Sequence, residues 1–191
     1  MLDSLYISKS KIRRDLLVLF FSNPSQKYYL RELERLLGCS AGSIRRELLR
    51  FQKDELFFTE KTGNLVYYSL NKKHPFYSEL KSIVLKTIGP EGSLKKALSS
   101  LGNIQTAFIY GSYASKTDKP SSDIDRMIVG EPNITELYRQ LRILEGKHYR
   151  EINPTIYTVE EYQCKKAQKR GFISDLLSNP KIMLIGKVDD L

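Results

Sequence analysis

The chain has 191 residues, of which 41% are hydrophobic and 28% charged, a composition typical of a globular protein with one large domain or two small ones. No apolar run approaches the ~20 residues that a membrane-spanning helix needs, so no membrane contact is expected. The two cysteines, Cys39 and Cys164, lie far apart, which argues against a disulfide framework or a cysteine metal site. We expect reduced thiols in a cytoplasmic protein.

The net charge of +9 is concentrated in the first half of the chain. Residues 1–86 hold 16 of the 31 Lys and Arg and 9 of the 22 Asp and Glu, a balance of +7, which leaves +2 for the remaining residues. A basic half of this kind indicates contact with a polyanion. A merely solubilising surface would carry the same charge, and charge alone does not separate the two interpretations.

The first half predicts three helices in chain order. Apolar residues recur at helical spacing over residues 9–21, and a second helix covers Leu30–Leu37, with Gly38 placed to cap its end. After a tight turn, a third helix is expected over Ala41–Lys53. The residues that this helix is expected to bury are Ile44, Leu48, Leu49 and Phe51.

Two stretches rich in aromatic and β-branched residues follow, at residues 56–59 and 65–70. Residues 60–64 between them contain a glycine, which predicts a β-hairpin. Helix, turn, basic helix and hairpin in this order resemble the winged-helix domains of prokaryotic transcription regulators over residues 9–71.

The winged-helix resemblance implies double-stranded DNA as a partner, with the third helix in the major groove and the hairpin on the backbone or minor groove. The residues that it assigns to DNA are Ser43, Arg45, Arg46 and Arg50 on the helix, and Lys61 and Asn64 on the hairpin. Winged helices also serve as protein–protein modules, in which these arginines would simply be solvated. Such regulators commonly dimerise on two half-sites, so a homodimer is expected.

A break in the chain separates this region from the second half. Residues 76–87 predict a further helix, and Gly89-Pro90-Glu91-Gly92 then interrupts the helical pattern. We therefore expect a DNA-binding domain over residues 1–88 and a second domain over residues 89–191.

The second domain is expected to begin with a helix over residues 93–101 and a strand over residues 104–110, which ends at Gly111 and Ser112. A glycine lets the backbone approach a ligand closely. A serine hydroxyl with neighbouring N–H groups can hold phosphate oxygens. This turn is therefore a candidate phosphate site.

Two aspartates follow at the start of the next expected strand, residues 124–129. Asp123 and Asp125 are two residues apart, so their side chains point to one face, about 7 Å apart along the backbone. Like charges on one face favour a cation between them, and Mg²⁺ is the hard cation that takes carboxylates together with substrate phosphates.

Gly-Ser, ten residues and Asp-x-Asp in this order resemble the minimal nucleotidyltransferases of the DNA polymerase β-like superfamily over residues 93–160. The resemblance implies that Gly111 and Ser112 hold the phosphates of a nucleoside triphosphate (NTP). It also implies that Asp123 and Asp125 bind Mg²⁺ or Mn²⁺ and act in catalysis. In that family a third carboxylate on a later strand activates the acceptor hydroxyl.

The sequence departs from the family pattern at three points. Lys116 stands where the family often has a glycine, and Arg126 follows the second aspartate where an apolar residue is usual. The third point is the later strand, expected over residues 149–157, which offers no clear aspartate.

Glu151 is the candidate third catalytic acid, because it is the one carboxylate on the later strand that shares a face with Asn153 and Thr155. The competing interpretation is that Glu151 pairs with a nearby arginine at the surface. If Asn153 or Thr155 occupies the site instead, nucleotidyl transfer would be weak or lost, whereas nucleotide binding could survive.

Three more elements complete the expected second domain: a helix over residues 131–146, a helix over residues 159–178 interrupted at Gly171, and a short strand over residues 181–186. The expected fold class is thus α+β and α/β in two domains. A winged helix-turn-helix precedes a nucleotidyltransferase fold with a small mixed sheet flanked by helices.

Two functions are compatible with these motifs. The first is a DNA-directed enzyme that transfers a nucleotidyl group from an NTP to a hydroxyl on a protein, small molecule or RNA. The second is a transcription regulator whose second domain is inactive and serves as a nucleotide sensor or dimerisation module.

Overall fold

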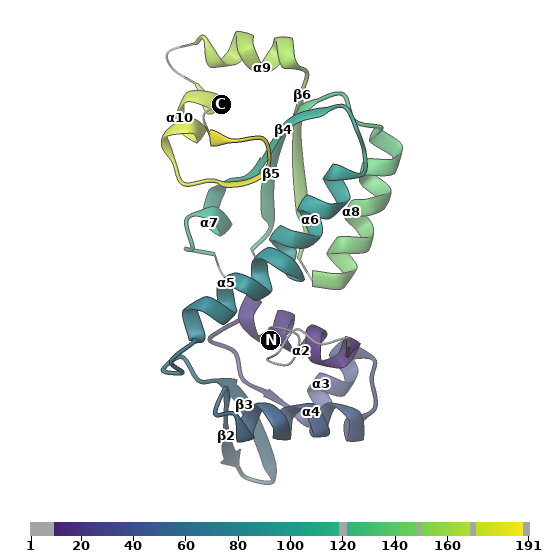
Figure 1. The fold of residues 1–191 in the computed structure, drawn as a ribbon, viewed down its shortest axis with the longest axis vertical. Coiled ribbons are helices and arrows are strands. Elements are labelled where there is room, and N and C mark those ends of the chain that lie inside the picture. The colour runs from purple at the N-terminus through teal and green to yellow at the C-terminus, as the bar shows by residue number, and fades with distance from the viewer. Residues whose placement is uncertain (1–9, 119–121, 149, 169–170, 189–191) are drawn as a thin grey trace. The chain divides into compact units, whose positions relative to one another are not determined.

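The computed structural model of the chain divides into two compact units, Met1–Gly89 and Pro90–Leu191 (Figure 1). The parts of the chain that it describes are residues 10–118, 122–148, 150–168 and 171–188. Each unit has its own hydrophobic core. None of the described helices is long and apolar enough to cross a membrane.

The described part of the first unit combines four helices with a small sheet. Its described elements are α2 (Lys11–Ser22), β1 (Tyr28–Tyr29), α3 (Leu30–Leu37), α4 (Ala41–Lys53), β2 (Phe57–Thr62), β3 (Leu65–Leu70) and α5 (Tyr77–Thr87). The strands form an antiparallel sheet in the order β1-β3-β2. Gly38 ends α3 with a left-handed φ of 60°, a conformation that glycine adopts without strain.

The hairpin is longer and tighter than the sequence predicted. Only Gly63 and Asn64 remain between β2 and β3, and Gly63 has a φ of 59°. Lys61 therefore lies on a strand, opposite Val66, rather than in a loop. The pairing of β1 with β3 was not predicted, because a two-residue strand has too little pattern to be recognised.

Aromatic rings pack against one another in the core of the first unit. The ring centroid of Phe20 lies 5.1 Å from that of Tyr28 and 4.4 Å from that of Phe57. From α4 the core receives Ile44, Leu48 and Phe51, as predicted.

The prediction that Leu49 is buried was wrong, because this side chain is 49% exposed. At about 100° per residue, Leu49 is turned away from the stripe that its neighbour Leu48 shares with the core. An apolar side chain therefore stands on the outer face of α4.

The second unit is a mixed sheet covered by helices on both faces (Figure 1). Its described elements are α6 (Pro90–Ser99), β4 (Ile104–Ile109), α7 (Gly111–Ala114), β5 (Ile124–Gly130), α8 (Ile134–His148), β6 (Ile152–Tyr157), α9 (Val159–Lys166), α10 (Phe172–Ser178) and β7 (Ile182–Ile185). The strand order is β6-β5-β4-β7, with β5 and β6 parallel and the other pairs antiparallel.

Side chains along β5 alternate between the two faces of this sheet. Ile124 and Ile128 pack with α6 and α8, whereas Met127 and Val129 pack with α9 and α10. Asp125 alternates with Met127 and so belongs to the α9/α10 face. The mixed sheet flanked by helices agrees with the fold class expected for this half of the chain.

Several element ends differ from the prediction. The helix expected from residue 93 begins at Pro90, since proline is well suited to the first turn of a helix. The interrupted helix is two helices, and Gly171 between them has a φ of 148°. The later strand begins at Ile152, and residue 149, where it was expected to begin, lies outside the described residues.

Candidate functional site

Gly111 brings the end of β4 against a carboxylate of β5. The backbone N–H of Tyr110 donates to the carbonyl oxygen of Asp125 at 3.0 Å, which holds the two strands together at this point. Gly111 has a φ of 73°, and a Cβ built on it would lie 2.9 Å from Oδ2 of Asp125. The left-handed backbone conformation therefore favours glycine here, and a residue with a Cβ would also displace the Asp125 carboxylate.

The segment after Gly111 folds back on the turn. The N–H of Ser115 donates to Gly111 O at 3.1 Å, and that of Thr117 donates to Ser112 O at 3.0 Å. Within this loop Lys116 has a φ of 59°. The left-handed conformation costs a non-glycine residue about 1 kcal/mol, which gives a physical reason for the glycine usual at this position in the resembling family.

The two aspartates lie next to each other with an amide beside them. Asp123 precedes β5, and Asp125 pairs in register with Asn153 of the parallel strand β6. The Asn153 Nδ2 donates to Asp123 Oδ2 at 2.5 Å. Burial and the negative charge of Asp123 raise the pKa of Asp125, whereas a hydrogen bond from Asn153 lowers it. The pair is thus an environment that a cation would stabilise.

The contact to Asp123 is made by Asn153, and no contact joins Glu151 to it in the described structure. Glu151 is exposed and precedes β6, where its carbonyl oxygen accepts from the N–H of Ile124 at 2.9 Å. Among the described residues, no cluster of three or more His, Cys, Asp or Glu side chains could hold a metal ion. In the part of the chain that the structure describes, the carboxylates at this point that could ligate a cation are those of Asp123 and Asp125.

The rings of Tyr110 and Phe172 lie in contact on the α9/α10 face of the sheet, which was not predicted from the sequence. The Tyr110 hydroxyl and Thr155 Oγ1 are 3.0 Å apart, so the Tyr110 side chain crosses from β4 towards β6. The Phe172 ring meets that of Tyr110 edge-on, with centroids 5.8 Å apart. Burial is the main cause that raises the pKa of Tyr110. The alternation of Phe108 and Tyr110 along β4 was the available signal.

Arg150 belongs to a separate contact that braces the loop after α7. Its Nη2 donates to Asp118 Oδ2 at 2.5 Å, and its guanidinium lies 5.3 Å from the ring centroid of Tyr113. The side chain of Arg150 is only 2% exposed. This contact joins the residue before β6 to the segment between the candidate phosphate turn and the aspartates.

Arg126 lies on the opposite face of the sheet from Asp125 and so is not part of the site. It is fully buried, and none of its three guanidinium nitrogens has a hydrogen-bond partner among the described residues. Burial lowers its pKa to about 10, although the nearby charge of Glu145 on α8 opposes that shift. An apolar position has thus been taken by a buried cation.

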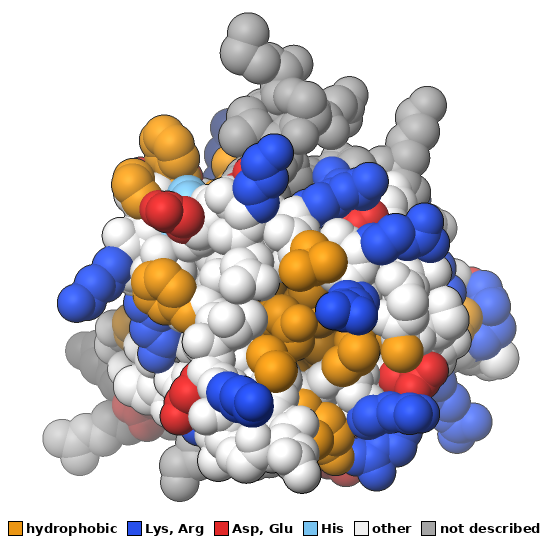
Figure 2. Space-filling view, turned by 90° about the horizontal axis from the view of Figure 1, so that it is seen from below, with side chains coloured by type: hydrophobic (Ala, Val, Ile, Leu, Met, Phe, Trp, Pro, Cys, Tyr) orange, Lys and Arg blue, Asp and Glu red, His pale blue; other side chains and the backbone are white. Residues whose placement is uncertain are grey.

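The basic residues expected on α4 differ in their surroundings. Figure 2 shows hydrophobic side chains at the centre of the face seen from below, with Lys and Arg around them. The Arg46 Nη2 donates to Ser43 Oγ at 3.3 Å, and Ser43 also bonds Ser40 at 3.0 Å. Arg45 is exposed and forms no hydrogen bond or ion pair with the described residues.

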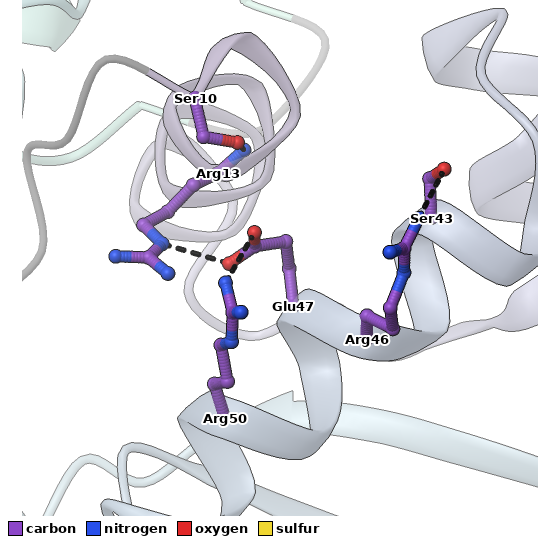
Figure 3. A network of polar contacts seen from close by, with 6 residues as sticks. All are labelled: Ser10, Arg13, Ser43, Arg46, Glu47 and Arg50. Atoms are coloured by element: carbon purple, nitrogen blue, oxygen red, sulfur yellow. Dashed lines mark hydrogen bonds and ion pairs between the residues drawn. The ribbon is translucent and has the colours of Figure 1, made fainter.

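Arg50 is engaged by a buried carboxylate that the sequence analysis missed. Glu47 is 8% exposed and accepts from Arg13 Nε at 2.7 Å and from Arg50 Nη1 at 3.0 Å (Figure 3). Glu47 therefore fastens α2 to α4 and holds Arg50 at the edge of the helix. Its place between Ile44 and Leu48 on the buried stripe was the available signal.

The hairpin residues Lys61 and Asn64 are both exposed, and their side chains form no hydrogen bond or ion pair with the described residues. A pocket of about 270 Å³ lies between the hairpin, α4 and the start of α3. Its lining residues are Tyr29, Leu30, Arg31, Arg45, Asn64, Leu65, Val66 and Tyr68. This surface offers cations and apolar groups together.

Of three comparisons with known proteins, the one that matches a defined part of the chain concerns the second unit. No curated protein sequence matches the chain. The solved structure "Reduced HlyU from Vibrio cholerae N16961" is 23% identical, covers 39% of this chain and 75% of its own, and has a TM-score of 0.31. The "Crystal structure of the toxin-antitoxin with AMP-PNP" is 16% identical, covers 53% and 77%, and has a TM-score of 0.37. At these TM-scores neither likeness identifies a function for this chain.

The family model "Polymerase beta, Nucleotidyltransferase" matches residues 93–179. The matched range includes the candidate phosphate turn at Gly111 and Ser112, the two aspartates and Asn153. Residues 93–179 of the second unit are therefore similar to polymerase β-like nucleotidyltransferase domains.

Proposed function

We propose that this protein binds DNA and that its second unit binds an NTP with Mg²⁺ or Mn²⁺ and transfers a nucleotidyl group to a hydroxyl acceptor. The observation that supports this most directly is the approach of Gly111 to the Asp125 carboxylate, whose Oδ2 lies 2.9 Å from the position of a Cβ built on Gly111. The candidate phosphate turn and the candidate metal carboxylates are thereby held side by side, as nucleotide chemistry requires.

In such a transfer the acceptor oxygen forms a bond to the α-phosphorus, the bond from that phosphorus to pyrophosphate breaks, and the hydroxyl proton is released. The backbone and hydroxyl of Gly111 and Ser112 would hold phosphate oxygens. Asp123 and Asp125 would hold a divalent cation, which would supply charge stabilisation to the transferring phosphoryl group. The fit is chemical, since both ligands are hard oxygen donors whose mutual repulsion a cation relieves.

Incubation with each labelled NTP, Mg²⁺ and candidate acceptors tests the enzymatic proposal. We expect label transfer by the unaltered protein and its loss in Asp123→Asn. Asp175→Asn is the matched control, because Asp175 is an exposed acid of the same unit on α10. Silence with all four NTPs and every acceptor class would contradict transferase activity.

The second candidate, a nucleotide sensor without turnover, is favoured by one observation. Asn153 donates to Asp123 from the strand where a third acid was expected, and an amide cannot accept the acceptor's proton. In that case equilibrium dialysis would detect Mg²⁺-dependent NTP binding without label transfer. Asn153→Asp would then create turnover, whereas Glu151→Gln would leave binding unchanged. If the unaltered protein transfers label and the Glu151→Gln variant does not, Glu151 is the third acid.

DNA binding is proposed for the first unit as a winged helix. It is supported by the local charge balance of +7 and by three exposed polar side chains without partners in the described structure, Arg45, Lys61 and Asn64. Fluorescence anisotropy with duplex DNA should show a steep salt dependence that Arg45→Ala reduces. Arg139→Ala removes an exposed, paired arginine of the other unit and is the control. Absence of binding at low salt would favour a protein–protein module.

A homodimer is proposed as the DNA-binding state, since paired half-sites call for two copies of the reading helix. Sedimentation equilibrium of the full chain, with and without duplex, measures this directly. A monomer under both conditions would refute it.

A further inference from the structure

The outer face of α4 has an apolar side chain at its centre. Leu49 is 49% exposed on a helix whose other exposed residues are polar or glycine. Its neighbours one helical turn away are Arg45, Arg46, Gln52 and Lys53. Gln52 donates a hydrogen bond to β2 at 3.3 Å, whereas Arg45 and Lys53 form none with the described residues. Three of the four neighbours of Leu49 are therefore cations, which can reach a polyanion.

The pocket beside α4 continues this mixed surface onto the hairpin. Arg45 lines the pocket and also lies one turn before Leu49, so the two features share a residue. Leu65 and Val66, which are 41% and 42% exposed, supply apolar lining. The arrangement complements a DNA strand, which alternates anionic phosphates with apolar sugar faces.

We infer, on the basis of the proposed DNA binding, that Leu49 determines sequence specificity by contacting the C5-methyl group of thymine in the major groove. Thymine is the one DNA base that presents a methyl group there, and apolar side chains recognise it by contact. Arg45 binds a backbone phosphate at the pocket, which positions the duplex without reading its sequence.

The test uses the full chain and a duplex enriched from a random pool, in which each thymine is replaced in turn by deoxyuridine. Deoxyuridine lacks only the methyl group, so one or two positions should bind about three- to fivefold more weakly. Leu49→Ala should weaken the thymine duplex and remove the difference between the two bases. Leu49→Met should retain the difference, because it preserves an apolar side chain of similar length.

Two control variants separate this contact from general effects. Phe58→Ala removes a 53% exposed hydrophobic side chain from the face of β2 opposite the buried Phe57, and should leave the preference for thymine intact. Arg45→Ala should weaken thymine and deoxyuridine duplexes equally. Equal affinity for the two duplexes, or failure of any sequence to be enriched, overturns the inference while DNA binding stands. Absence of all duplex binding at low salt overturns both.

Discussion

Glu47 in the first unit and Arg126 in the second are both charged residues in buried positions, yet their surroundings are opposite. Glu47 accepts from two arginines on two helices. Arg126 is fully buried, and its guanidinium has no hydrogen-bond partner among the described residues. A buried charge with hydrogen-bonded partners of opposite charge is compensated for the water that it loses on folding. A buried charge without partners lowers the free energy of unfolding, and other contacts must offset that loss. The two units thus carry buried charge at different cost.

His148 is a second buried ionisable residue of the second unit without a hydrogen-bond partner among the described residues. We expect it to have a larger effect on stability than Glu47 or Arg126. The ring is 6% exposed, both nitrogens lack a partner among the described residues, and burial lowers its pKa to about 4. The folded ring stays neutral while the unfolded ring gains a proton below about pH 6.5. Stability is therefore fully present above pH 6.5 and falls by up to about 3 kcal/mol as pH drops towards 4.

Urea denaturation of the second unit between pH 7 and pH 4 measures this loss. His148→Phe should flatten the pH dependence, and His74→Gln, in the other unit, should leave it in place. A slope unchanged in His148→Phe would mean that other groups cause it.

Glu47→Gln removes the carboxylate that pairs with Arg13 and Arg50. We expect the first unit to lose about 2 kcal/mol, because Arg13 would keep a mostly buried charge without its counterion. The loss is below the full range for buried pairs, since the Arg50 side chain is 61% exposed. Urea denaturation at pH 7 measures it. Glu60→Gln removes a surface ion pair with Lys27 and should cost less than about 1 kcal/mol; a similar cost for the two variants would contradict the importance of burial.

Arg126→Met should have the opposite sign. Methionine fills a similar volume without charge, so we expect the second unit to gain about 1–2 kcal/mol in the free energy of unfolding. Arg139→Met, at an exposed and paired arginine, should change stability little. Destabilisation by Arg126→Met, measured by thermal or urea unfolding, would show that the guanidinium makes contacts in solution that offset its burial.

The features that could be predicted from the sequence are those with local pattern. Asp123 and Asp125 share a face because strand side chains alternate, and Gly111 precedes them at a distance that the family resemblance marks. The helices of α3 and α4 follow their apolar spacing. The contact between Asn153 and Asp123 could not be predicted, because it depends on the register of parallel strands joined through α8.

The partners of charged residues were equally invisible in the sequence. Glu47 meets Arg13 from 34 positions away, and Leu49 was misplaced because a small error in helical phase moves a residue from the inner to the outer face. Arg126 was recognised as unusual from the sequence, but its complete burial came only with the packing of α8 over the sheet.

Substitutions at Lys116 should have the smallest effect on stability. They separate the contribution of backbone strain from that of the side-chain charge, which the other variants do not. Its φ of 59° is unfavourable for any side chain with a Cβ, and Lys116→Gly removes that strain. Lys116→Ala removes the same charge but keeps the Cβ, so it serves as the matched control. We expect Lys116→Gly to exceed Lys116→Ala by about 1 kcal/mol in the free energy of unfolding of the second unit, measured in urea. Equal stability of the two variants would show that a Cβ costs nothing in this backbone conformation, and would contradict the strain inferred from the φ of Lys116.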